Sequence, residues 1–386
     1  MSEYYPYYGY DNCAVIVKKP VLPMRETYSW LTDILTSFNG TEDRSPLRSK
    51  PRLAVTHKYE FTKAEKADVF NTVYGGVRKG WAVPLWQYAQ KISTQSGSAI
   101  SCDTSYPLKD REMVLIYVSD AVWRFADIHS SSLNVINISE SIADLINPWL
   151  IPVKLGYING DASLISTGHD GVIELSFRLN HSNTLTGIIP DQFNSKDLCF
   201  DQRLHGSGNT YKSNIFAEEY LADFNLGKIN SITPWLNSKI TQTQYAVNKG
   251  LNEFNTFLKW LYRREGRYLE YWRPSLEKDF RILSTGALTT SINVYRDSFT
   301  TWSLNRIHIV FQDKSGNWIP KTIINVIILD DTTMTLEWSG SIGIAAENIY
   351  RMCYLGLRRL NSDTINIDWI GDMVNKCELV DTEISA

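Results

Sequence analysis

One arrangement of residues occurs twice, about half a chain apart, and it limits the possible folds more than any other feature. An alternating strand-like run is followed by a helical pattern, then glycine, an aromatic residue and proline. The first copy starts at Pro51-Arg52, runs to Phe61, and reaches Gly80-Trp81-Ala-Val-Pro84 after the helix. The second copy occupies residues 241–247, 251–261 and Tyr271-Trp272-Arg-Pro274. Two related units are therefore expected.

The match continues downstream of both prolines. In each copy an apolar run ends at aspartate, a short turn follows, and tryptophan opens the next run, which is typical of a β-hairpin. The residues are Leu115–Asp120 with Trp123, and Ile309–Asp313 with Trp318. Internal duplication explains the ordered set, and convergent hairpin chemistry is the alternative.

Helical patterns are short, and most of the remaining apolar residues alternate as they do in half-buried strands. Thr62 and Glu65 fit a capping box before the first helix, and Leu251, Phe254 and Leu258 give the helical spacing of the second. The sequence predicts a β-dominated α+β fold with two related β-rich halves, each with one short helix.

The 386 residues are too many for one ordinary core. We predict an N-terminal tyrosine-rich arm at 1–25, a first β-rich repeat domain at 26–180, and a second at 211–386. Residues 181–210, rich in Asn, Ser, Asp and Gly, are predicted to form a linker or long loop. The arm is either a frayed end or a segment that packs on a neighbouring subunit.

Composition argues against several functional classes. The net charge is −3, and no specific nucleic-acid site is expected. The two small basic groups, residues 44–52 and 263–267, are expected to form solvated or salt-bridged surface, with phosphate binding as the alternative. Apolar runs have strand length, so neither a signal peptide nor a membrane span is expected. The five widely spaced cysteines predict free thiols, not a disulfide framework or zinc site.

Searches for catalytic motifs find nothing specific. The chain contains no G-x-S-x-G elbow, no H-E-x-x-H pair and no phosphate-binding loop with its Lys-Ser/Thr. Carboxylates such as Asp279 and Glu337 are available, but no spacing singles out a pair. We therefore expect no enzyme activity, no catalytic residue, no cofactor and no metal.

Several segments resemble bacteriophage tail proteins. The opening from Trp30 through Asn39-Gly40, Glu42 and Arg44 to Pro51-Arg52 is similar to the opening of that group. The segments Gly80-Trp-Ala-Val-Pro-Leu-Trp86 and Tyr271-Trp-Arg-Pro-Ser-Leu276 resemble a motif that follows in it, and Leu357–Asp363 resembles its close. The second motif departs from the first by carrying Leu276 where Trp86 stands.

The resemblance implies a structural ring component of the tail, in the distal tail, tail tip, hub or sheath. Its partners would be copies of itself, as a trimer or hexamer ring, and tail tube and tip proteins; it would be assembled in the host cytoplasm and reside in the virion. The alternative is a carbohydrate- or receptor-binding or depolymerising tail protein. The motif residues expected to matter structurally are Trp30, Asn39, Gly40, Glu42, Arg44, Pro51, Arg52, Trp81, Pro84, Trp86, Trp123, Trp272, Pro274 and Trp318.

Overall fold

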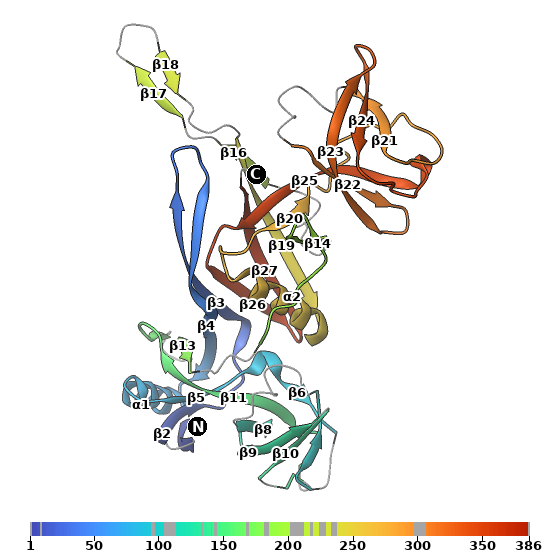
Figure 1. Cartoon of the computed structure of the whole chain (residues 1–386). Helices are drawn as coiled ribbons and strands as arrows, with labels where there is room; N and C mark the ends of the chain where they lie inside the picture. Colours follow the sequence, from blue (N-terminus) through green and yellow to red (C-terminus); the bar gives the residue numbers. More distant parts are fainter. Residues whose placement is uncertain are drawn as a thin grey trace.

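The structure is a computed structural model. It describes residues 2–7, 10–93, 97–103, 113–132, 134–139, 141–142, 145–166, 170–180, 185–200, 212–216, 219–223, 229–232, 238–296 and 306–384. Strands dominate this part of the chain, which contains two α-helices, so the predicted β-dominated α+β class is confirmed (Figure 1). The "first half" below is residues 2–179, and the "second half" is residues 192–383.

The first half contains β1 (Ser2–Tyr7), β2 (Tyr10–Ile16), β3 (Val21–Thr36), β4 (Glu42–Thr62), α1 (Lys66–Gly76), β5 (Trp81–Pro84), the short helix η1 (Trp86–Tyr88), β6 (Gln90–Lys91), β7 (Ala99–Ser101), β8 (Met113–Ser119), β9 (Val122–Ser132), β10 (Val135–Ile138), β11 (Trp149–Ile158), β12 (Ser163–Ser166) and β13 (Asp170–Leu179).

The second half contains β14 (Gln192–Phe193), β15 (Lys196–Leu198), β16 (Lys212–Phe216), β17 (Tyr220–Asp223), β18 (Ile229–Ile232), β19 (Lys239–Lys249), α2 (Leu251–Arg264), β20 (Tyr271–Pro274), β21 (Ser291–Tyr295), β22 (His308–Asp313), β23 (Trp318–Ile328), β24 (Thr333–Trp338), the short helix η6 (Ala346–Asn348), β25 (Ile349–Leu360), β26 (Thr364–Gly371) and β27 (Val374–Glu383).

The two halves share one pattern of strand pairing. In the first half β11 pairs with β5, β8 and β13, and β13 also pairs with β4 and β12. In the second half β25 pairs with β20, β22 and β27, and β27 also pairs with β19 and β26. The hairpins β8–β9 and β22–β23, and the pairs β3–β4 and β16–β19, correspond in the same way.

The register of these ladders also corresponds. In each half three ladders are linked through the same or adjacent residues. Equivalent positions in the two halves can therefore be followed from one ladder to the next. The pairs are Ala54↔Arg178, Tyr157↔Arg178 and Gly156↔Trp81 in the first half, and Thr241↔Thr382, Arg359↔Thr382 and Arg358↔Tyr271 in the second. Pro84 and Pro274 close equivalent ladders, opposite Val153 and Leu355.

The described parts of the N-terminal segment and of the predicted linker contain strands that pair with the rest of the chain, which differs from the free arm and loop expected from the sequence. The boundary at residue 25 falls inside β3, and β2 pairs parallel with β5 through Ala14 and Trp81. Within 181–210, β14 and β15 pair, and β15 runs parallel to β20. The strands are short and their neighbours polar, so the sequence resembles a loop although the backbone bonds are made within the sheet.

One ribbon of strands joins the halves. Its order is β12, β13, β4 and β3 from the first half, then β26, β27, β19 and β16 from the second. Each strand is antiparallel to its neighbours. The long β3–β4 hairpin of the first half thus lies along the second half (Figure 1). Four strands in one order are followed by the four equivalent strands in the same order.

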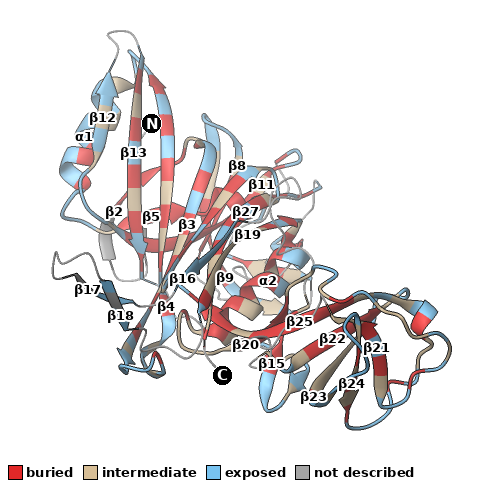
Figure 2. Ribbon diagram, turned by 90° about the horizontal axis from the view of Figure 1, so that it is seen from above, coloured by how far each residue is buried: buried red, intermediate tan, exposed pale blue. Residues whose placement is uncertain are grey.

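α1 begins at Lys66 with Glu65 as its N-cap, later than the capping box at Thr62 predicts, and one of the bonds of that box is present. The carboxylate of Glu65 accepts a hydrogen bond from the backbone N–H of Thr62 at 2.7 Å before α1 begins. α2 ends at Arg264, followed by Glu265 and Gly266 with φ of 50° and 68°. α2 buries Phe254, Leu258 and other apolar residues, whereas α1 is largely exposed (Figure 2).

The largest core cluster contains residues of both halves. Phe254 of α2 lies 5.0 Å from the Trp369 ring of β26 and 6.1 Å from the Tyr88 ring of the first half. A separate core lies under β21–β24, where Phe311 and Trp338 are fully buried. The halves therefore fold around a shared centre and are not independent globules.

Phe254→Ala should lower the free energy of unfolding by about 3 to 5 kcal/mol, because it leaves a cavity between aromatic rings of both halves. Urea unfolding monitored by tryptophan fluorescence measures this loss. Ile324→Ala, at a site 67% exposed, is the control and should change it by less than about 0.5 kcal/mol. Two separate transitions, only one of them shifted by Phe254→Ala, would contradict a shared core.

Candidate functional site

Among the described strands, the ladder between β3 and β26 is the one that joins the two halves. It runs from Met24↔Trp369 to Ser29↔Thr364. On its outer face Arg25 donates to Asp368 at 2.7 Å, and the Thr27 hydroxyl donates to the amide oxygen of Asn366 at 2.8 Å. We call this contact the β3–β26 junction.

The inner face of the junction is covered by α2 and is apolar except for the fully buried Glu26, whose carboxylate accepts hydrogen bonds from Gln87 at 2.7 Å and Tyr88 at 2.9 Å. Tyr28 and Ile367 are fully buried there. The Tyr262 ring of α2 meets Trp30 edge-on at 5.8 Å and Tyr28 at 6.2 Å. Trp30, predicted to matter structurally, thus joins a strand of the first half to a helix of the second.

Asp363, just before β26, fixes the end of the junction. Its carboxylate accepts hydrogen bonds from the backbone N–H of Thr32 at 2.8 Å and of Arg267 at 2.9 Å. Its carbonyl accepts from the N–H of Trp30 at 2.8 Å. Gly266 has φ +68°, and a Cβ there would lie 2.3 Å from the Asp363 carboxylate. Only glycine fits this close approach.

The Asn39-Gly40 turn reaches across to the second half. The Asn39 side-chain oxygen accepts from the Thr41 N–H at 3.1 Å, and Gly40 has φ 84°. The Gly40 carbonyl accepts from the ammonium of Lys239 at 2.7 Å. The turn is therefore a hairpin end anchored on β19.

Glu42 is the centre of a charged network behind this turn. Arg359 of β25 donates to both of its oxygens, at 2.7 and 2.9 Å, and Lys239 lies 3.5 Å away. The side chains of Glu42, Arg359 and Lys239 are 7%, 8% and 5% exposed. Desolvation would raise the pKa of Glu42, but Arg359, Lys239 and Arg44 outweigh it and hold this pKa below its usual value.

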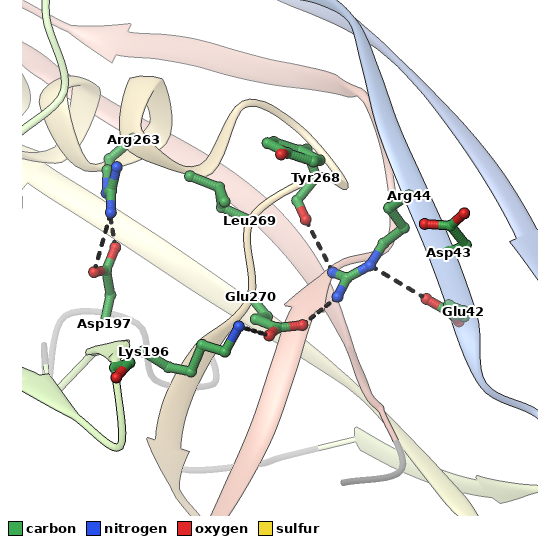
Figure 3. Close-up of a pocket in the computed structure, with 10 residues that line it drawn as sticks. Glu42, Asp43, Arg44, Lys196, Asp197, Arg263, Tyr268, Leu269 and Glu270 are labelled. Atoms are coloured by element: carbon green, nitrogen blue, oxygen red, sulfur yellow. Dashed lines mark hydrogen bonds and ion pairs between the residues drawn. The ribbon is translucent and has the colours of Figure 1, made fainter.

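Beside Glu42 lies a cavity of about 300 Å³ (Figure 3). Arg44 crosses it, bonded to the Glu270 carboxylate and, at 2.9 Å, to the Tyr268 carbonyl. Lys196 also pairs with Glu270, and Arg263 donates to Asp197 at 2.9 Å. The lining residues are Glu42, Asp43, Arg44, Ser195, Lys196, Asp197, Arg263, Tyr268, Leu269 and Glu270.

The cavity's paired carboxylates are held ionised. Burial would raise the pKa of Asp197 and Glu270, but their arginine and lysine partners lower both below the usual values. A general acid in glycoside hydrolysis needs a raised pKa instead. The ion pairs connect β4, β15, α2 and the segment before β20. Their role is therefore to hold these four elements in position.

The other predicted motif residues lie apart from this cavity. Pro51 is buried and Arg52 exposed on β4. Trp81 donates to the Gly76 carbonyl at 2.9 Å, and Trp86 packs edge-on to Tyr117 at 5.0 Å. Trp272 lies 4.6 Å from His308. Trp123 and Trp318 stand at equivalent hairpin positions, opposite Tyr117 and Gln312.

Sequence reasoning missed the partners of the network: Asp197, Lys239, Glu270, Arg359 and Asp363. Asp197 lies in the segment predicted as a linker, although it is only 4% exposed. The basic groups at 44–52 and 263–267 were expected to be solvated or salt-bridged, and Arg44, Arg263 and Arg267 are salt-bridged. Single charged residues within strands carry no signal for a partner far away in the sequence.

Compared with models of known protein families and with curated proteins, the chain matches none. No group of three metal-ligating side chains occurs among the described residues. Neither described helix has the length and hydropathy needed to cross a bilayer.

Glu42→Gln should lower the free energy of unfolding at pH 7 by about 3 kcal/mol, because it leaves buried Arg359 and Lys239 without their anion. A carboxylate with a depressed folded pKa contributes its stability above the unfolded pKa of about 4.5, and loses it as pH falls through the folded value. The gap between wild type and variant should therefore narrow below about pH 4.5 in urea titrations at several pH values.

Asp43→Asn is the matched control, because Asp43 is exposed on the adjacent position of β4. It should leave stability within about 0.5 kcal/mol of wild type. A constant gap between Glu42→Gln and wild type from pH 7 to pH 3 would contradict an ionised, charge-stabilised Glu42.

Proposed function

We propose that the chain is a structural, ring-forming component of a bacteriophage tail that acts by assembly of identical subunits. The observation that carries the proposal is the ribbon in which four strands of the first half are followed by the four equivalent strands of the second. An ancestral module doubled within one polypeptide accounts for equivalent strands, equivalent pairings and equivalent registers.

The contact between the halves is of the kind that generates rings. β3 of the first half meets β26 of the second, and the equivalent of β26 in the first half is β12, not β3. The contact is therefore head-to-tail. Such a heterologous contact, repeated with a constant rotation, closes into a ring or continues as a filament. Three chains would give a pseudo-sixfold ring and six chains a larger sixfold ring.

The tail assignment is supported by the motif resemblance from Trp30 to Arg52 and around Pro84 and Pro274. These residues form the end of β3 next to the junction, the first part of β4, and the equivalent strands β5 and β20. Placement in the distal tail, tail tip, hub or sheath, with tail tube and tip proteins as partners, is part of this proposal. No enzymatic step, cofactor, membrane or specific nucleic acid enters it.

A carbohydrate- or receptor-binding or depolymerising role has less support. Stacking on sugars uses exposed aromatic faces beside the catalytic carboxylates. Every tryptophan whose burial is described is buried or half-buried, and the exposed Phe70 and Tyr74 of α1 do not line the cavity beside Glu42. The cavity beside Glu42 is lined mainly by paired charges. These features favour assembly as the function.

Purified protein should form closed rings, with a mass of three or six times 44.2 kDa by native mass spectrometry and a central opening in electron micrographs. The tail assignment is checked separately by the neighbouring genes, which should encode tail tube, tape-measure and tip proteins. A strictly monomeric chain at high protein concentration, or a gene neighbourhood of cellular enzymes, would contradict the proposal.

A further inference from the structure

Both ends of the strand ribbon are open. Among the described residues β12 pairs only with β13, and β16 pairs only with β19. β12 is equivalent to β26, and β16 to β3. The strands β26 and β3 pair with each other at the junction, whereas β12 and β16 have no such partner among the described residues.

We propose that β16 pairs antiparallel with β12 of the next copy of this chain, repeating the β3–β26 junction between subunits. The inference rests on the proposed ring and names the surface that makes it. Exposed strand edges readily pair with other chains unless they are covered, so mutual pairing also removes two exposed edges per subunit.

The register of the new ladder follows from the ladders already present. Ala54 and Thr241 are equivalent, which makes Thr27 and Asn214, their partners on β3 and β16, equivalent as well. On the other side, Ile173 and Cys377 are equivalent, and they pair with Leu164 and Ile367. The residues before these two, Ser163 and Asn366, are therefore equivalent as well. Thr27 faces Asn366 in the junction.

Asn214 is therefore expected to face Ser163 of the next copy. Its neighbours follow in antiparallel order, with Ser213 facing Leu164 and Ile215 facing Ala162. The side chains of Asn214 and Ser163 are both polar and exposed, as suits the position where Thr27 and Asn366 form a hydrogen bond.

A side chain of β16 is exposed where the equivalent side chain of β3 is buried, as expected if β16 lacks a neighbouring subunit in this structure. Ile215 of β16 is the equivalent of Tyr28 of β3. Tyr28 is fully buried beneath α2, whereas Ile215 is 71% exposed. The apolar side chain of Ile215 would be covered if the next copy supplied a helix as α2 covers Tyr28.

α1 has the exposed aromatic face for that role. Thr62 and Lys249 end equivalent ladders before the two helices. Eight residues later stand Phe70 in α1 and Phe257 in α2. Phe257 is 2% exposed, whereas Phe70 is 51% exposed and stacks on Tyr74, itself 79% exposed.

The helix and the open strand edge form one surface. Lys66, at the start of α1, donates to the Ser166 hydroxyl of β12 at 2.6 Å. Phe70 and Tyr74 therefore stand on the same side of the molecule as β12, and α1 lies beside this strand (Figure 2). A second copy entering with β16 would meet a backbone edge and an aromatic helix face together.

Cysteine pairs test the register. In Asn214→Cys/Ser163→Cys the opposed Cα atoms of neighbouring strands would lie about 4.5 to 5.5 Å apart, within disulfide reach. Two thiols would lose two electrons and two protons to added oxidised glutathione, which is reduced to two glutathione thiols. We expect covalent dimers and larger oligomers on non-reducing gels, each reversed by reductant. The five native cysteines are buried and give little background.

Two matched variants control the cross-linking. Thr27→Cys/Asn366→Cys carries the equivalent pair within one chain and should give only an intramolecular disulfide. Asn214→Cys/Ser166→Cys moves one cysteine by three residues, roughly 10 Å along the strand, and should cross-link at least tenfold less. Equal cross-linking by the shifted pair would overturn the proposed register.

Ile215→Asp tests the apolar contact without cysteines. It should weaken assembly at least tenfold in sedimentation measurements and leave the circular dichroism of the chain unchanged, because Ile215 is exposed in the subunit. Ile324→Asp, at an equally exposed site on β23, should assemble as wild type does. Equal loss in both variants would contradict a specific β16 contact.

The outcomes separate this inference from the proposed function. Rings that form without cross-linking in Asn214→Cys/Ser163→Cys and are unaffected by Ile215→Asp would overturn the β12–β16 contact and leave the ring standing. A wild-type chain that stays monomeric, together with an Asn214→Cys/Ser163→Cys variant that gives no intermolecular product, would overturn both.

Discussion

The ladder between β3 and β26 places residues more than 300 positions apart side by side, and the arrangement of the two halves depends on it. Its outer face is set by Arg25–Asp368 and Thr27–Asn366, and its inner face is closed by α2 on Tyr28 and Trp30. A shift of one residue would move every side chain to the opposite face. The polar pairs outside and aromatic residues inside therefore define one register.

Buried charges add orientation to this junction. Glu42 meets Arg359 and Lys239 where the β3–β4 hairpin ends on the second half, and Asp363 binds the backbone at the other end. Buried ion pairs are often no more stabilising than apolar packing, but an unpaired member is costly. A docking of the halves that separated Glu42 from Arg359 while both stayed buried would be costly, so the network favours this arrangement.

The sequence predicted the class of fold, both helices and the paired hairpins, because these depend on local patterns. Thr62 with Glu65, Gly266 after α2, Trp123 at the second position of β9 and Trp318 at the first of β23 are all local signals. It predicted neither the inclusion of β2 and β15 in the sheet nor the partners of Glu42. Those depend on pairings across the chain, and a lone Asp197 in a polar segment looks the same whether it is exposed or bonded to Arg263.

The repeated pairing pattern and the open edges give one consistent account. Within a chain, the β3 side of one unit meets the β26 side of the next, and α2 covers the contact. Between chains, β16, β12 and α1 offer the equivalent strands and helix, with Ile215 and Phe70 exposed where Tyr28 and Phe257 are buried. Among the described residues, both ends of the ribbon therefore lack the partner strand that the proposed contact would supply.

An electron cryomicroscopy reconstruction of the assembled wild-type protein tests this account most directly. It should show first and second halves alternating around an axis, with the strand ribbon continuous from β16 of one subunit into β12 of the next. Subunits joined instead through the β21–β24 lobes, with β12 and β16 both facing solvent, would contradict it.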